Sequence, residues 1–85
     1  MRCETWLFTR DGDELEITLY EHPDPTANPE DIEVTSTDGT EEERASWDDA
    51  RGLILTGLIP DYTAKGWQPA AHHPMRDVPG DRASW

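Results

Sequence analysis

The chain has 85 residues, a formal net charge of −12 and one cysteine, and these facts exclude several classes of protein. A chain of this size makes one small domain with little room for a deep cofactor pocket. Its negative charge would repel nucleic-acid phosphates and anionic membranes, so direct binding to either is not expected. Cys3 has no second cysteine to pair with, and no apolar run is long enough to span a bilayer, so we expect a soluble, cytoplasmic protein.

The excess of acids lies in the first 50 residues. These contain 16 acids and three bases, which gives 3 − 16 = −13, whereas residues 51–85 contain three acids and four bases, which gives +1. Residues 29–50 alone place nine carboxylates against one cation, Arg44. A protein with this distribution of charge is expected to bind a basic partner.

The first predicted element is a hairpin over residues 3–21. Asp11-Gly12 is a favoured pair for a two-residue turn, and alternating residues flank it. This turn places Phe8 opposite Leu15 and Glu4 opposite Leu19. One face of the hairpin then carries Trp6, Phe8, Leu15, Ile17 and Leu19, and the other carries Thr5, Thr9, Glu14, Glu16 and Thr18.

A loop and a third strand are predicted next. Residues 22–30 contain three prolines and favour a loop, and residues 31–37 alternate again with Ile32 and Val34 facing inward. A second two-residue hairpin at Asp38-Gly39 is not expected, because it would pair Val34 with Glu43.

The sequence instead predicts one amphipathic helix after residue 39, ending at Pro60. Thr40 and Glu43 form a capping box, while Ser46 with Asp49 offers a second possible start. The inward arc of this helix contains Trp47, Ala50, Leu53, Ile54, Gly57 and Leu58. Its outer surface contains the carboxylates Glu41, Glu42, Asp48 and Asp49.

The predicted fold class is α+β, with a small antiparallel β-sheet in the order β-β-β-α and one amphipathic helix packed on one face. Residues 62–67 are a candidate for a short fourth strand. We expect residues 1–67 to form a single α+β domain and the proline-rich residues 68–85 to form an extended C-terminal tail.

Few residues offer catalytic or metal-binding chemistry. A nucleophilic pair of Cys3 with His22 lacks an orienting third group. His72, His73 and Met75 are ligands that copper or nickel accepts, but their spacing matches no zinc framework. We therefore predict no catalytic residue, no metal and no cofactor, and keep a small metal- or thiol-dependent enzyme as an alternative.

The acidic segment has three interpretations: a solvated face that maintains solubility, an adaptation to high salt, and a binding face. Salt adaptation predicts acids spread evenly along the chain, so the net charge of +1 over residues 51–85 counts against it. We predict a non-enzymatic binding protein that inhibits or regulates a nucleic-acid-handling protein by occupying its basic surface. The predicted contact residues are Glu33, Glu41, Glu42, Asp48 and Asp49.

In size and acidity the chain resembles small phage proteins that inhibit CRISPR effectors or restriction enzymes. This resemblance implies an inhibitor that mimics nucleic acid. An acidic antitoxin or accessory subunit whose tail folds onto its partner is a further alternative.

Overall fold

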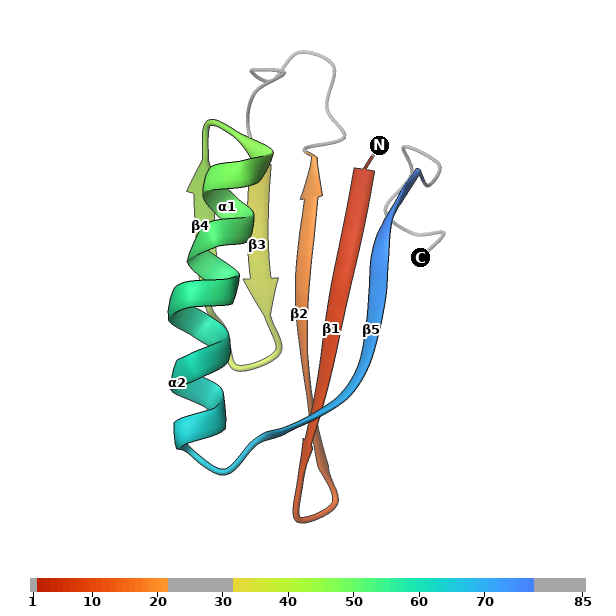
Figure 1. Ribbon diagram of the computed structural model, residues 1–85, viewed down its shortest axis with the longest axis vertical. Helices are drawn as coiled ribbons and strands as arrows, with labels where there is room; N and C mark the ends of the chain where they lie inside the picture. Colours follow the sequence, from red (N-terminus) through yellow and green to blue (C-terminus); the bar gives the residue numbers. More distant parts are fainter. Residues whose placement is uncertain (1, 22–31, 78–85) are drawn as a thin grey trace.

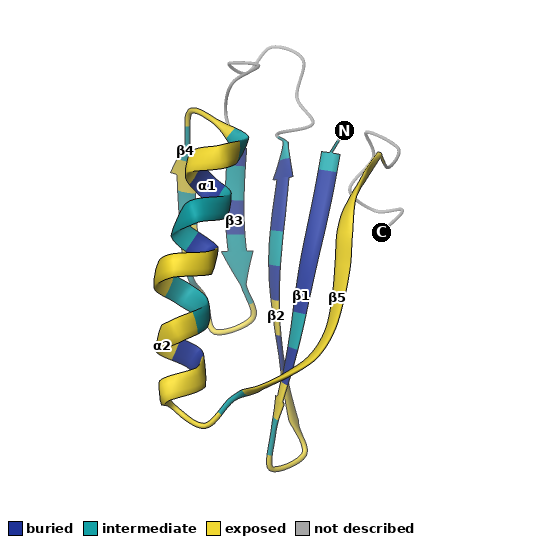
Figure 2. Cartoon of the chain, viewed as in Figure 1, coloured by how far each residue is buried: buried dark blue, intermediate teal, exposed yellow. Residues whose placement is uncertain are grey.

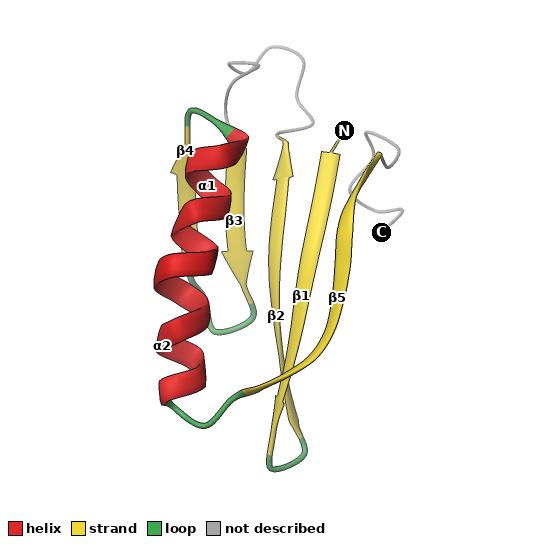
Figure 3. Ribbon diagram, viewed as in Figure 1, coloured by secondary structure: helices red, strands yellow, loops and turns green. Residues whose placement is uncertain are grey.

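The computed structural model describes residues 2–21 and 32–77, which form one antiparallel sheet with a single helix on one face (Figure 1). The strands are β1 (Arg2–Arg10), β2 (Asp13–Glu21), β3 (Ile32–Ser36), β4 (Glu41–Arg44) and β5 (Gln68–Asp77). Their order across the five-stranded sheet is β4-β3-β2-β1-β5. The helix consists of α1 (Trp47–Leu53), a π-helical stretch η1 (Ile54–Leu58) and α2 (Ile59–Ala64), and it lies on the β3 and β4 side of the sheet (Figure 3). The predicted α+β class is confirmed.

The β1–β2 hairpin forms in the predicted register. Phe8 pairs with Leu15, Trp6 with Ile17 and Glu4 with Leu19. Asp11 and Gly12 have φ angles of 51° and 85°, the positive values that a type I′ turn requires at both central positions.

The core lies between the sheet and the inner side of the helix (Figure 2). Its members from the sheet are Trp6, Phe8, Leu15, Ile17, Leu19, Ile32 and Val34, and those from the helix are Ala50, Ile54 and Tyr62. Trp47 and Leu58, two other residues of the predicted inward arc, are partly buried against this cluster. Gly57 is exposed.

Residues 41–44 form an edge strand, so the predicted helix start at Thr40 is wrong. A three-residue loop, with Gly39 at φ 98°, joins β3 to β4 and pairs Val34 with Glu42 in place of Glu43. Loops of this length close hairpins with a residue of positive φ at the last loop position. The second predicted start is the real one, because Ser46 Oγ accepts a hydrogen bond from the Asp49 N–H at 3.1 Å.

The helix also continues through Pro60, which was expected to end it. A proline ring in a regular α-helix clashes with the carbonyl four residues earlier, here Thr56. The wider π-helical turn of η1 precedes Pro60 and relieves that clash. Residues 62–64 are therefore helical, not part of a fourth strand, and Tyr62 is a core residue that is 3% exposed.

Residues 68–77, the first part of the predicted extended tail, form β5 and pair with β1. The sheet therefore extends ten residues beyond the expected boundary at residue 67. Residues 78–85 and the predicted loop 22–30 lie outside the described residues. In the described part of the chain, every helix is too short or too polar to cross a membrane.

Replacement of a buried helix residue tests the packing of helix on sheet. Ile54 is fully buried, whereas its neighbour Leu55 is 41% exposed. Ile54→Ala should lower the free energy of unfolding by about 2–5 kcal/mol because it leaves a cavity. Leu55→Ala, the matched control, should change it by about 0.5 kcal/mol or less. Equal losses for the two variants in urea unfolding would contradict this packing.

Candidate functional site

The face of the sheet opposite the helix, here called the open face, has carboxylates on β2, β3 and β4 and bases on β5. Strand pairing aligns Glu43, Glu33, Tyr20, Cys3 and Arg76 in one row across all five strands. The next row contains Glu41, Thr35, Thr18, Thr5 and His73. The charge of this face therefore changes from negative at β4 to positive at β5.

The acidic side of the open face contains a like-charged pair. Glu33 on β3 lies directly opposite Glu43 on β4, an arrangement that destabilises a sheet when nothing neutralises it. Glu41 lies two residues before Glu43 and on the same face, and both side chains are exposed. The Tyr20 hydroxyl donates a hydrogen bond to Glu33 Oε2. Among the described residues, no cation forms an ion pair with any of these three glutamates.

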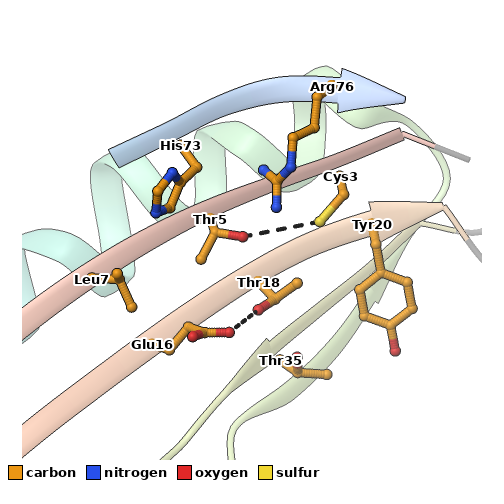
Figure 4. A pocket seen from close by; sticks show the side chains of 9 residues that line it. All are labelled: Cys3, Thr5, Leu7, Glu16, Thr18, Tyr20, Thr35, His73 and Arg76. Atoms are coloured by element: carbon orange, nitrogen blue, oxygen red, sulfur yellow. Dashed lines mark hydrogen bonds between the residues drawn. The ribbon is translucent and has the colours of Figure 1, made fainter. Parts of the chain in front are cut away.

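The middle of the open face is hollowed into a depression of about 380 Å³ (Figure 4). His73 and Arg76 of β5 stand on one side of it, with Cys3 and Thr5 of β1 beside them. The Cys3 side chain is buried, and its sulfur lies 3.9 Å from Thr5 Oγ1. A nucleophilic thiol needs an adjacent base, whereas the group in hydrogen-bonding contact with this sulfur is the Thr5 hydroxyl.

The structure separates the histidines that sequence analysis considered together. His73 faces the open face, whereas His72 faces the side of the helix and contacts Glu4. His22 lies outside the described residues. Within residues 2–21 and 32–77, no group of three or more His, Cys, Asp and Glu side chains is placed to hold a metal ion.

The predicted contact residues lie on three different surfaces. Glu33 and Glu41 share the open face. Glu42 points to the helix side of β4, where the Arg44 guanidinium lies 3.0 Å from its carboxylate. Asp48 and Asp49 are exposed in the first turn of α1.

Glu43 was not among the predicted contact residues, because the capping box with Thr40 placed it in the first turn of a helix. Strand alternation beyond a three-residue loop would have placed Glu43 beside Glu41 and opposite Glu33. Whether these carboxylates bind a partner stays a prediction.

A second cluster of charged groups lies on the helix side of the sheet, around Glu4. The Glu4 side chain is 3% exposed and accepts hydrogen bonds from Arg51 Nε at 3.0 Å and Nη2 at 3.3 Å. His72 Nε2 lies 2.6 Å from Glu4 Oε2, and its ring stacks on Trp6 with centroids 5.2 Å apart. Glu4 thus joins β1 to the helix and to β5.

The environment of Glu4 favours its charged form. Burial on its own would raise the pKa of this carboxyl, but the hydrogen bonds and charges of Arg51 and His72 outweigh burial and hold the pKa below its ordinary value. Both oxygens are occupied by groups of the same chain. This cluster therefore acts as a structural connection between elements.

No family model, curated protein or solved structure matches the chain. The geometry and charge of the open face are consequently the basis for a functional proposal.

Loss of the Glu4 charge should reduce stability in a pH-dependent way. Glu4→Gln should lower the free energy of unfolding at pH 7 by about 1.5–3 kcal/mol, the usual contribution of hydrogen bonds to a charged group. Because the pKa of Glu4 in the folded state lies below its ordinary value of 4.5, this contribution is complete above pH 4.5 and declines as pH falls through the folded-state pKa.

Urea unfolding of both proteins between pH 7 and about pH 3 checks this expectation, since the difference between them should shrink towards acid pH. Glu14→Gln, at an exposed position of β2, is the matched control and should leave the stability within about 0.5 kcal/mol of the parent. A difference that stays constant with pH would show that Glu4 does not contribute through its charge.

Proposed function

We propose that the protein is a non-enzymatic binding protein whose open face occupies the basic surface of a nucleic-acid-handling protein. The observation that carries this proposal is the set of half-buried Glu33 with exposed Glu41 and Glu43, which includes a directly opposed like-charged pair and forms no ion pair with a cation of the described chain. We call these three residues the glutamate cluster.

The glutamate cluster is stabilised when a cation approaches it. Neighbouring strands lie about 4.8 Å apart, so Glu33 and Glu43 repel each other across a short distance. Arginine or lysine side chains of a partner would replace that repulsion with attraction. The whole chain, at a net charge of −12, would also accelerate the approach of a basic partner at low salt.

A surface that binds nucleic acid is a suitable partner because carboxylates and phosphates present similar features to it. Arginine forms paired hydrogen bonds with either group through the same planar fork of N–H donors. The glutamate cluster lies on two neighbouring β-strands, so its charges are held at fixed spacings, as phosphates are on a nucleic-acid strand. Occupation of such a surface would inhibit the partner.

The resemblance in size and acidity to small phage inhibitors supports the same kind of partner. On this proposal the target is a CRISPR effector, a restriction enzyme or another protein whose basic groove holds DNA or RNA. The protein itself would bind no nucleic acid.

Two variants that lose the same charge on different surfaces test this proposal. The sheet variant is Glu41→Gln with Glu43→Gln, and the helix variant is Asp48→Asn with Asp49→Asn. Tagged parent and variants are used to recover the partner from the native host at low salt, and bound proteins are eluted by rising salt. The recovered partner is then tested for release of a labelled DNA or RNA when the protein is added.

The sheet variant should bind about tenfold more weakly, mainly through slower association, while the helix variant should bind nearly as the parent does. Both variants should keep the thermal midpoint of the parent. Equal affinity of parent and sheet variant, or a partner that keeps its nucleic acid when the protein is bound, would refute the proposed function. A loss confined to the helix variant would move the contact surface to Asp48 and Asp49.

A further inference from the structure

The two edges of the sheet differ in how they can pair with another strand. At the β5 edge, Pro69 and Pro74 lack backbone N–H groups, and the pairing of β5 with β1 is interrupted by two irregularities of register. Both features protect an edge from further pairing. At the opposite edge, β4 contains no proline and pairs with β3 in unbroken register. Within the described residues, β4 is therefore the edge that is open to another strand.

Hydrogen bonding of the β3–β4 hairpin shows which backbone groups of β4 face outward. The Ser36 N–H donates to the Thr40 carbonyl at 3.0 Å, so these two residues form a hydrogen-bonded pair. Hydrogen-bonded and non-hydrogen-bonded pairs alternate along an antiparallel ladder. The pair of Val34 with Glu42 is then hydrogen-bonded, whereas Glu41 and Glu43 direct their N–H and C=O groups away from β3. The outward Glu43 carbonyl accepts a hydrogen bond from Arg44 Nη1 at 2.8 Å, and an incoming strand would replace this contact with a backbone N–H.

We propose that β4 is a docking edge, to which a basic, extended segment of a partner protein adds as a further antiparallel strand. The outward backbone groups belong to Glu41 and Glu43, the same residues whose side chains stand on the open face. A strand that pairs with them would place its own side chains opposite these carboxylates on that face. This inference rests on the proposed function, because it specifies how the glutamate cluster binds its basic partner.

Charge selects the occupant of this edge. A second copy of the chain would bring glutamates of its own β4 next to Glu41 and Glu43, and like charges directly opposite each other destabilise strand pairing. On the helix side of β4, Glu42 is neutralised by Arg44 of the same strand. Among the described ion pairs, the β4 glutamates without a cation are thus Glu41 and Glu43 on the open face. The partner segment should therefore carry a basic residue at every second position.

A synthetic nine-residue peptide that alternates arginine and threonine is the probe for this edge. With arginines opposite Glu41 and Glu43 in an antiparallel pair, the arginine N–H groups point at β4 and the threonine N–H groups point away. Methylation of the arginine amides therefore removes the bonding donors, and methylation of the threonine amides does not. The two methylated peptides have the same composition and charge, so each controls for the other.

Two variants of the protein complete the design. Glu43→Gln removes one charge and keeps the N–H group, whereas Glu43→Pro removes both. A proline is tolerated on an edge strand where its missing N–H would face solvent, so the β3–β4 ladder should survive. Thermal unfolding checks that each variant folds. If Glu43→Pro does not fold, the methylated peptides still test the proposal on the unmodified protein.

Binding is measured by titration calorimetry, and protection of the Glu41 and Glu43 amides is followed by hydrogen exchange. The parent should bind the peptide and its threonine-methylated form alike, and the arginine-methylated form about tenfold more weakly. Glu43→Pro should bind the unmethylated peptide about fivefold more weakly than Glu43→Gln does.

Equal binding of the two methylated peptides to the parent would overturn strand addition. The proposed function would survive that result if Glu43→Gln still bound more weakly than the parent, because charge would then act without backbone pairing. It would fail as well if neither charge removal nor added salt changed the affinity. A dimer of the free protein that Glu43→Pro dissociates would identify a second copy as the occupant and overturn the assignment to a basic segment.

Discussion

The register of the β1–β2 hairpin determines which side chains reach each face of the sheet. Because side chains alternate along a strand, a shift of one residue would exchange the two faces of β1 and β2. The turn at Asp11 and Gly12 prevents that shift, since both residues adopt the positive φ angles of a two-residue loop. β3 and β5 then pair with strands whose faces are already defined, and β4 takes its register from β3.

That division of faces separates stability from charge. All buried apolar residues of the main core, together with Glu4, lie on the helix side. The glutamate cluster lies on the opposite side, at the edge of the sheet that the four-residue strand β4 forms. A short edge strand confines the repulsion between Glu33 and Glu43 to one end of the ladder. Substitutions on the two faces share few contacts and should have nearly additive effects on stability.

The sequence was sufficient to predict the features of the fold that depend on local chemistry. The Asp11-Gly12 turn and the alternation beside it predicted every pair of the first hairpin, and the side-chain cap at Ser46 was recognised as a possible helix start. The error at residues 40–44 came from two local signals in conflict, a capping box and an Asp-Gly turn. The turn prevails because a longer loop allows Val34 to pair with Glu42.

Features that depend on distant residues were not predictable in this way. β5 pairs with β1 across most of the chain, and its prolines obscured the strand pattern. The partners of Glu4 are 47 and 68 residues away in sequence, so only its place on an apolar face hinted that it needed partners. The same limit applies to the candidate site, where composition predicted the excess of carboxylates and not the face on which they gather.

The contrast between the two edges connects the fold to the proposed function. A sheet with two open edges risks uncontrolled pairing, and this chain protects one edge with prolines and irregular register and the other with charge. Prolines weaken pairing with an incoming strand of any charge because they remove backbone donors. On our proposal, charge excludes only strands of the same sign, so the β4 edge would reject copies of itself and accept a basic segment. The second kind of protection is therefore selective, and selectivity is what a binding edge requires.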